Sequence, residues 1–164
     1  EEKAKIMNLQ VRNFDLTNND ATKEFIVDYD ITSPSFMANT GETFLLNIGL
    51  LIGKQSEMYF EKERKLEIDV NNPHRYERTF NIQIPLGYKI SNLEALNKNV
   101  QLTGSSSEDY AGFISSYEIK DNLLSLVVKE YYNFTTLPAS NFEGFKKVIN
   151  ASADFCKITL IITK

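Results

Sequence analysis

Apolar and polar residues alternate with a period of two along most of the chain, which is typical of strands with one buried and one wet face. The clearest such segments are Glu24–Ile31, Lys65–Val70 and Tyr76–Ile84. In the last segment the alternating apolar residues are Tyr76, Phe80, Ile82 and Ile84. Segments of this kind predict antiparallel sheets that are packed on one side.

Weaker alternation predicts the remaining strands of the fold. Their apolar positions are Met7, Leu9 and Val11; Phe44, Leu46 and Ile48; Val100 and Leu102; Phe113, Tyr117 and Ile119; Leu124, Leu126, Val128, Tyr132 and Phe134; and Cys156, Ile158, Leu160 and Ile162. Asp121-Asn122 is typical of a two-residue hairpin turn. We therefore expect an all-β fold with one helix: an antiparallel β-sandwich of about nine strands, immunoglobulin-like or related, with a short helix near the C-terminus.

The helix is predicted from a capping box. In Ser140-Asn141-Phe142-Glu143, Ser140 takes the N-cap position and Glu143 the third helical position. We expect a helix over 141–153 that lies across a sheet edge or closes one end of the sandwich. Its predicted buried positions are Phe142, Phe145, Ile149 and Ser152 or Ala153.

The length of 164 residues fits one domain, 1–164. The charged run 57–65 indicates either a loop or a join between an N-terminal β subdomain, 1–60, and a second part, 65–164. We favour the loop, because neither half has enough strands for independent folding. The chain begins Glu1-Glu2-Lys3, so we expect a mature form or an excised piece of a larger protein.

Composition excludes several classes of function. The net charge is −4, and this acidity argues against nucleic-acid binding. No stretch approaches the ~18 apolar residues that span a bilayer, so we expect no membrane span. One Cys excludes a disulfide framework within the chain, and one His makes His-rich metal sites and His-dependent catalysis improbable. We expect no enzyme activity, no metal and no cofactor.

Cys156 and His74 are the candidates for a nucleophile and its base. Strand parity places Cys156 on an apolar face, where a buried thiol is inert, and His74 follows Asn71-Asn72-Pro73 in a predicted exposed turn. A structural role is therefore favoured for each. Paired carboxylates also occur, but nothing places two of them across a cleft, and we interpret them as solvated. These pairs are Glu61/Glu63, Asp28/Asp30 and Glu108/Asp109.

Two further groups are candidate binding residues. Asp15, Asn18 and Asp20 form an oxygen-rich loop that could hold Ca²⁺, but the EF-hand spacing is absent and a plain turn is favoured. Tyr131 is the candidate contact residue: parity turns Tyr132 and Phe134 toward the core and leaves Tyr131 outward.

Two segments carry a family resemblance. Ile84-Pro85-Leu86-Gly87-Tyr88-Lys89-Ile90 after a strand, and Leu137-Pro138-Ala139-Ser140-Asn141-Phe142-Glu143-Gly144-Phe145 before Ala151-Ser152-Ala153-Asp154-Phe155, resemble elements of one domain. It is the C-terminal β-sandwich domain, of unknown function, of bacterial exported transglutaminase-like proteins. Leu137 stands where that family often has an aromatic residue, and Cys156 where it often has Asn.

The resemblance implies a non-catalytic accessory module, because the family's catalytic residues lie in another domain. Its partner would be a transglutaminase- or protease-like catalytic core in the same polypeptide, and its location exported, periplasmic or at the cell surface. The alternatives are a free-standing sandwich that binds glycans or peptides, with Tyr131 stacking on sugars, and a carboxylate-dependent hydrolase. The oligomeric state is left open.

Overall fold

The computed structural model describes residues 5–12, 24–59, 62–104 and 108–164. The chain divides into two compact units, residues 1–38 and residues 39–164. Each unit is described by itself below. The division falls well before the charged run at 57–65, which the sequence marks as a loop or a join.

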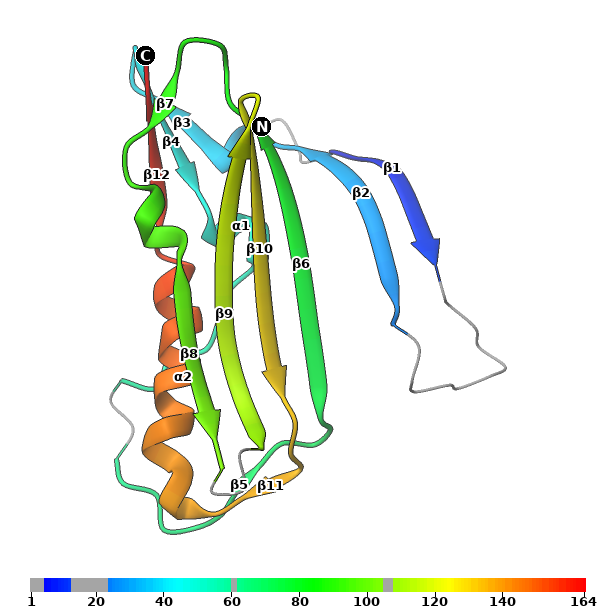
Figure 1. Ribbon diagram of the computed structural model, residues 1–164, viewed down its shortest axis with the longest axis vertical. Coiled ribbons are helices and arrows are strands. Elements are labelled where there is room, and N and C mark those ends of the chain that lie inside the picture. Colours follow the sequence, from blue (N-terminus) through cyan, green and yellow to red (C-terminus); the bar gives the residue numbers. More distant parts are fainter. Residues whose placement is uncertain (1–4, 13–23, 60–61, 105–107) are drawn as a thin grey trace. The chain divides into compact units, whose positions relative to one another are not determined.

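The first unit is a two-stranded antiparallel ribbon of β1 (Lys5–Arg12) and β2 (Ile26–Thr32), followed by a 3₁₀ turn at Pro34–Phe36 (Figure 1). The pairing shifts between Met7 and Gln10, so that Asn8 and Leu9 together lie opposite Tyr29. Asn8 has a φ of 51°, in the left-handed region that Asn tolerates better than most residues. This is a β-bulge, and it reverses the alternation of side chains along β1.

The bulge determines which residues share a face of the ribbon. A regular strand places Met7 with Leu9 and Val11, as the sequence predicts. In the structure Ile6 pairs with Ile31 and Val11 pairs with Val27, while Met7 lies opposite Asp30 on the other face. The prediction for Met7 is therefore wrong, because the extra residue moves it to the polar face.

The second unit is built on a long four-stranded antiparallel sheet in the order β6-β10-β9-β8. Its strands are β6 (His74–Gln83), β8 (Lys98–Thr103), β9 (Asp109–Lys120) and β10 (Leu123–Tyr132). Asp121 and Asn122, with φ values of 49° and 62°, make the tight turn between β9 and β10. Both values are those of a type I′ turn, so the predicted hairpin is confirmed.

A smaller sheet in the order β3-β4-β12-β7 has short strands. Its strands are β3 (Met37–Asn39), β4 (Thr43–Asn47), β7 (Lys89–Ile90) and β12 (Thr159–Thr163). A two-residue pairing joins β5 (Ile68–Asp69) to β11 (Thr136–Leu137). The helices are α1 (Gly49–Ile52), α2 (Phe142–Phe155) and 3₁₀ turns at Leu93–Leu96 and Ala139–Asn141.

Helix α2 packs on β8 and β9 and continues almost directly into β12 (Figure 1). Its buried residues are Phe142, Phe145, Val148, Ser152, Ala153 and Phe155. Gly144 permits this close approach, because a Cβ there would lie 2.6 Å from Cδ1 of Leu102 on β8. The helix starts after Asn141, which makes no side-chain capping bond, so the predicted Ser140 cap is wrong.

The irregular segment after α1 is anchored to α2. The Met58 amide donates to Oδ1 of Asn150 at 2.7 Å, and the Tyr59 hydroxyl donates to Asp154. Lys157 Nζ lies 2.9 Å from Glu57 and 4.8 Å from the centre of the Tyr59 ring. The described residues between α1 and β5 thus form a loop held against the helix.

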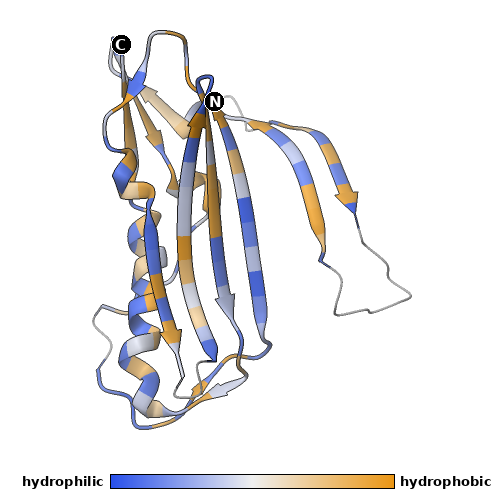
Figure 2. Cartoon of the chain, viewed as in Figure 1, coloured by the Kyte–Doolittle hydropathy of each residue, from blue (hydrophilic) through white to orange (hydrophobic). Residues whose placement is uncertain are grey.

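The core lies on the face of the long sheet that α2 covers. It includes the fully buried Phe113, Leu124, Leu126 and Val128 from the long sheet and Leu160 from β12. The ring centres of Phe113 and Phe155, from β9 and α2, are 5.3 Å apart. Figure 2 shows apolar residues alternating with polar ones along these strands.

The predicted fold class is confirmed: the described part of the chain is mostly strand, its sheets are antiparallel, and its one long helix lies near the C-terminus. Each predicted strand contains an observed strand, although Lys65–Val70 shortens to Ile68–Asp69. The three strands that the pattern did not predict, β3, β7 and β11, are two or three residues long. Two or three residues are too few to show a period-two pattern in the sequence.

Candidate functional site

Two opposite charges lie on the core face of the long sheet. Arg78 on β6 lies opposite Val128, and Glu130 on β10 lies opposite Tyr76. Because alternate residues of a strand point to the same side, Arg78 shares the side of Phe80 and Ile82, and Glu130 shares that of Val128 and Tyr132. Glu130 is only 6% exposed. A buried carboxylate is costly unless it is paired, so its partners decide its role.

Both carboxylate oxygens of Glu130 have partners. The Tyr132 hydroxyl donates to Oε1 at 3.0 Å, and Nη1 of Arg78 donates to Oε2 at 3.4 Å. The Arg78 side chain is 26% exposed and that of Glu130 is 8% exposed. The pair therefore reaches from the interior to the surface: Arg78 compensates the charge of Glu130, and the Tyr132 hydroxyl satisfies its other oxygen.

Aromatic rings surround this pair. The Arg78 guanidinium lies 4.8 Å from the centre of the Tyr76 ring, an arrangement typical of a cation–π contact. The His74 ring lies 5.0 Å from that of Tyr132 and 5.3 Å from that of Tyr76. We call His74, Tyr76, Arg78, Glu130 and Tyr132 the Glu130 cluster.

Electrostatics within the cluster oppose ionisation of Tyr132. Burial raises the pKa of its hydroxyl far above the ordinary value of 10.0, and the negative charge of Glu130 and the hydrogen bond to it add to the rise. Arg78 lowers this pKa, but by less. Tyr132 is therefore a hydrogen-bond donor at every physiological pH, which is the role it plays toward Glu130.

The charges of Glu130 and Arg78 also act on the thiol of Cys156, which is poorly suited to be a nucleophile. Burial raises the pKa of its thiol, Glu130 raises it further, and Arg78 opposes both. The thiol donates to the carbonyl of Gly53 at 3.5 Å. It follows α2 as the C-cap residue and is half-buried, so its predicted place on the last strand is wrong.

His74 is exposed, as expected, but it is the first residue of β6 rather than a turn residue. Its Nδ1 lies 2.8 Å from the carbonyl oxygen of Asn72. Within the described part of the chain, no hydrogen bond or ion pair joins His74 to Cys156. The structure thus does not bring the candidate nucleophile and base together as an activated pair.

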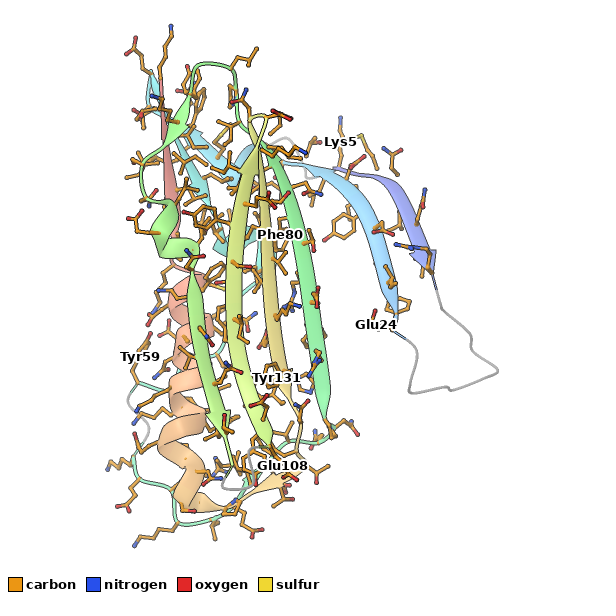
Figure 3. The ribbon with its side chains drawn as sticks, in the orientation of Figure 1. Lys5, Glu24, Tyr59, Phe80, Glu108 and Tyr131 are labelled. Atoms are coloured by element: carbon orange, nitrogen blue, oxygen red, sulfur yellow. The ribbon has the colours of Figure 1, made fainter. Side chains whose placement is uncertain are left out.

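Tyr131, labelled in Figure 3, lies on the opposite, outward face of the long sheet, but its side chain is buried. It is only 6% exposed, and its ring lies against Gly112, where a Cβ would come within 2.5 Å of the ring. Its hydroxyl donates to Gln101 at 3.0 Å, and Arg75 lies 5.2 Å from the ring centre. The expectation that Tyr131 is exposed and available for stacking is therefore wrong, whereas its role as a contact residue stays a prediction.

The candidate carboxylates Asp28, Asp30 and Asp109 are exposed, and each has a partner. Asp28 forms an ion pair with Arg12 at 2.7 Å, and Asp30 accepts a hydrogen bond from Asn8. Asp109 Oδ1 accepts a hydrogen bond from Thr103 at 3.2 Å. The Ca²⁺ candidates Asp15, Asn18 and Asp20 and the carboxylate of Glu61 lie outside the described residues. Within the ranges that are described, no three His, Cys, Asp or Glu residues lie close enough to hold a metal ion.

A cleft of about 420 Å³ lies between the loop before β5 and the start of α2. It is open to solvent and is lined by Glu63, Arg64, Lys65, Ala139, Ser140, Phe142 and Glu143. Its charges are of both signs and exposed, which is typical of a solvated surface.

No helix among the described residues is long and apolar enough to cross a membrane.

Sequence reasoning missed the Glu130 cluster although a signal for it exists. Arg78 and Glu130 stand at the apolar parity of their strands, between Tyr76 and Phe80 and between Val128 and Tyr132. A charged residue at such a position on each of two paired strands indicates a buried ion pair. The register that makes them neighbours is the part that only the structure provides.

Comparison with known proteins gives one fold-level likeness. No protein-family model matches the chain, and no curated protein matches it. A similar solved structure is that of a "putative protease" from Parabacteroides distasonis, with a TM-score of 0.50 and 11% sequence identity. The match covers 62% of this chain and 19% of that protein. At this identity the likeness shows the fold alone, and the transglutaminase-like resemblance stays a prediction.

Proposed function

We propose that this chain is a non-catalytic accessory module of a larger protease- or transglutaminase-like protein. The observation that carries the proposal is that a similar fold occurs as 19% of a longer chain described as a "putative protease". The sequence resemblance to the C-terminal domain of exported transglutaminase-like proteins supports the same role. It also supports an exported, periplasmic or cell-surface location, which fractionation of source cells tests.

The chemistry of the described side chains supports a non-catalytic role. Among the described residues Glu130 is the carboxylate buried in the core, and each of its oxygens accepts a hydrogen bond from within the fold. The thiol of Cys156 has a raised pKa, which opposes formation of the nucleophilic thiolate. Both features are typical of groups that stabilise a fold rather than act on a substrate.

The test compares three samples: the native full-length protein, the same protein with this module deleted, and the isolated chain. Peptidase and transglutaminase activities are measured on a small peptide and on a large protein substrate. We expect the isolated chain to be inactive, and the deletion to raise KM for the large substrate while kcat for the small one is kept. Turnover by the isolated chain that disappears in Glu130→Gln would contradict the proposal.

A second candidate is the binding of an extended peptide at the edge of the long sheet. In the sheet order β6 is an outer strand, and its ten residues, His74–Gln83, offer a long edge for strand addition. The glycan version of this idea has less support, because Tyr131 is covered by its neighbours. Peptide-dependent shifts of the β6 amide resonances, absent from β9, are the expected signature; uniform spectra across a peptide library would count against it.

A further inference from the structure

The ribbon of β1 and β2 has one apolar face, which we call the ribbon face. It consists of Ile6, Leu9, Val11, Val27, Tyr29 and Ile31. These side chains are between 37% and 60% exposed. The charged residues of the two strands lie on the other face, where Arg12 pairs with Asp28 at 2.7 Å. Figure 2 shows the alternation of apolar and polar residues along both strands.

The bulge at Asn8 is what makes this face continuous. Without the extra residue, Ile6 would lie on the charged side and Met7 would take its place beside Leu9. With it, the pairs Ile6–Ile31 and Val11–Val27 lie on either side of Leu9 and Tyr29. The left-handed conformation of Asn8 thus places the two aliphatic pairs on the same face as the Tyr29 ring.

A ribbon of two strands with such a face needs a covering layer. Isolated two-stranded ribbons are marginally stable in water, because their apolar face stays wet on one side. Six side chains about half exposed present roughly 550 Å² of apolar surface, taking ~185 Å² for each residue. A patch of that size on a monomer commonly marks an interaction site.

We propose that the ribbon face binds the ribbon face of a second copy of this chain. Two such faces bury roughly 1,100 Å² in total, which reaches the lower bound of about 1,000 Å² for a specific interface. The face is suited to a two-fold contact because it carries no charge, so two copies meet without like-charge repulsion. The product is a four-stranded, two-layer sandwich with Tyr29 of each copy as the central aromatic anchor.

The chain offers a closely matched pair of variants. Val11→Lys introduces a charge into the ribbon face, next to Leu9 and Tyr29, and Gln10→Lys introduces the same charge one residue earlier, on the opposite face. Sedimentation equilibrium of the full chain, from micromolar to millimolar concentration, measures the dimer dissociation constant. We expect a mass of twice 18.8 kDa at high concentration. We expect Val11→Lys to weaken the dimer by roughly tenfold or more, and Gln10→Lys by less than about twofold.

Two outcomes of the sedimentation experiment overturn the proposal, which does not rest on the proposed function. One is a monomer at every concentration, as expected if the face is covered by the second unit or by a different protein. The other is a dimer that Val11→Lys leaves unchanged.

Val27→Thr tests the same contact with a milder change, in case Val11→Lys unfolds the ribbon. Thr has the branched shape of Val, but its hydroxyl still weakens an apolar contact. In a mixture of isotope-labelled and unlabelled chains, contacts between Val27 methyl groups and the Tyr29 ring of the other copy are expected. Contacts found only within one copy refute the proposal.

Discussion

The Arg78–Glu130 pair allows a direct test of whether burial or distance decides the strength of an ion pair in this sheet. In Arg78→Met, Glu130 stays buried and keeps only the Tyr132 hydroxyl as a partner. Removing one partner of a buried pair costs about 3–5 kcal/mol. Because the Arg78 side chain is 26% exposed and the pair is only partly buried, we expect a smaller cost, about 2–3 kcal/mol.

The double variant Arg78→Met/Glu130→Gln separates the interaction between the two side chains from the cost of leaving a buried Glu130 charged and without its ion-pair partner. Glu130→Gln keeps an acceptor for Tyr132 and removes the charge, so by itself it should cost about 1–2 kcal/mol. Adding it to Arg78→Met should recover part of the loss, since a neutral amide beside an apolar side chain is no longer an unpaired ion. We expect a coupling free energy of about 1–3 kcal/mol.

The matched control lies on the opposite face of the same two strands. Lys129 Nζ is 3.0 Å from Glu77, closer than the 3.4 Å between Arg78 and Glu130, but both side chains are about half exposed. The corresponding cycle, with Lys129→Met and Glu77→Gln, should give less than about 0.5–1 kcal/mol. Urea unfolding followed by far-UV circular dichroism measures both cycles. An equal or larger coupling in the Lys129–Glu77 pair would refute the argument.

Three further predictions concern single positions. Gly112→Ala should lower the free energy of unfolding by about 1–3 kcal/mol, because the new Cβ displaces the Tyr131 ring; an unchanged urea midpoint would show that the ring is not seated there. The raised pKa of Tyr132 means that the unfolded chain loses this proton first, so stability is kept below pH 10.0 and falls as pH rises above it. Tyr132→Phe should make that alkaline fall shallower, and an identical slope would count against the assignment. Asn122→Val should cost about 1–2 kcal/mol, because a branched side chain at a φ of 62° is strained, whereas Asn122→Gly should cost nothing; thermal unfolding of both variants checks this.

Much of the fold could be predicted from the sequence because alternation and turn chemistry are local signals. Leu124, Leu126, Val128, Tyr132 and Phe134 are all buried, as the parity of their strand predicts. The hairpin between β9 and β10 needed only two residues that tolerate positive φ.

The failures have non-local causes. Tyr131 has the predicted outward parity, but it is buried because Gly112 on the neighbouring strand leaves room for its ring, and strand register is not visible in a sequence. The predicted N-cap at Ser140 is wrong because a 3₁₀ turn precedes α2 and moves the helix start by one residue. The helix also runs to Phe155, which removes Cys156 from the last strand.

Part of the candidate site could be predicted from the sequence. The sequence favoured a structural role for Cys156 and His74 and interpreted the paired carboxylates as solvated, but it did not single out Glu130. The parity of Glu130 in β10 is the signal that marks it as buried. What the parity could not show is that Arg78, far away in the sequence, closes the pair.

The size of the native polypeptide tests the central proposal most directly. An antibody against this chain is used to blot lysate and envelope fractions of the source cells. The account predicts a band several times larger than 18.8 kDa, because an accessory module shares its polypeptide with a catalytic core. A band near 18.8 kDa would contradict that proposal and make peptide binding at β6 the leading one.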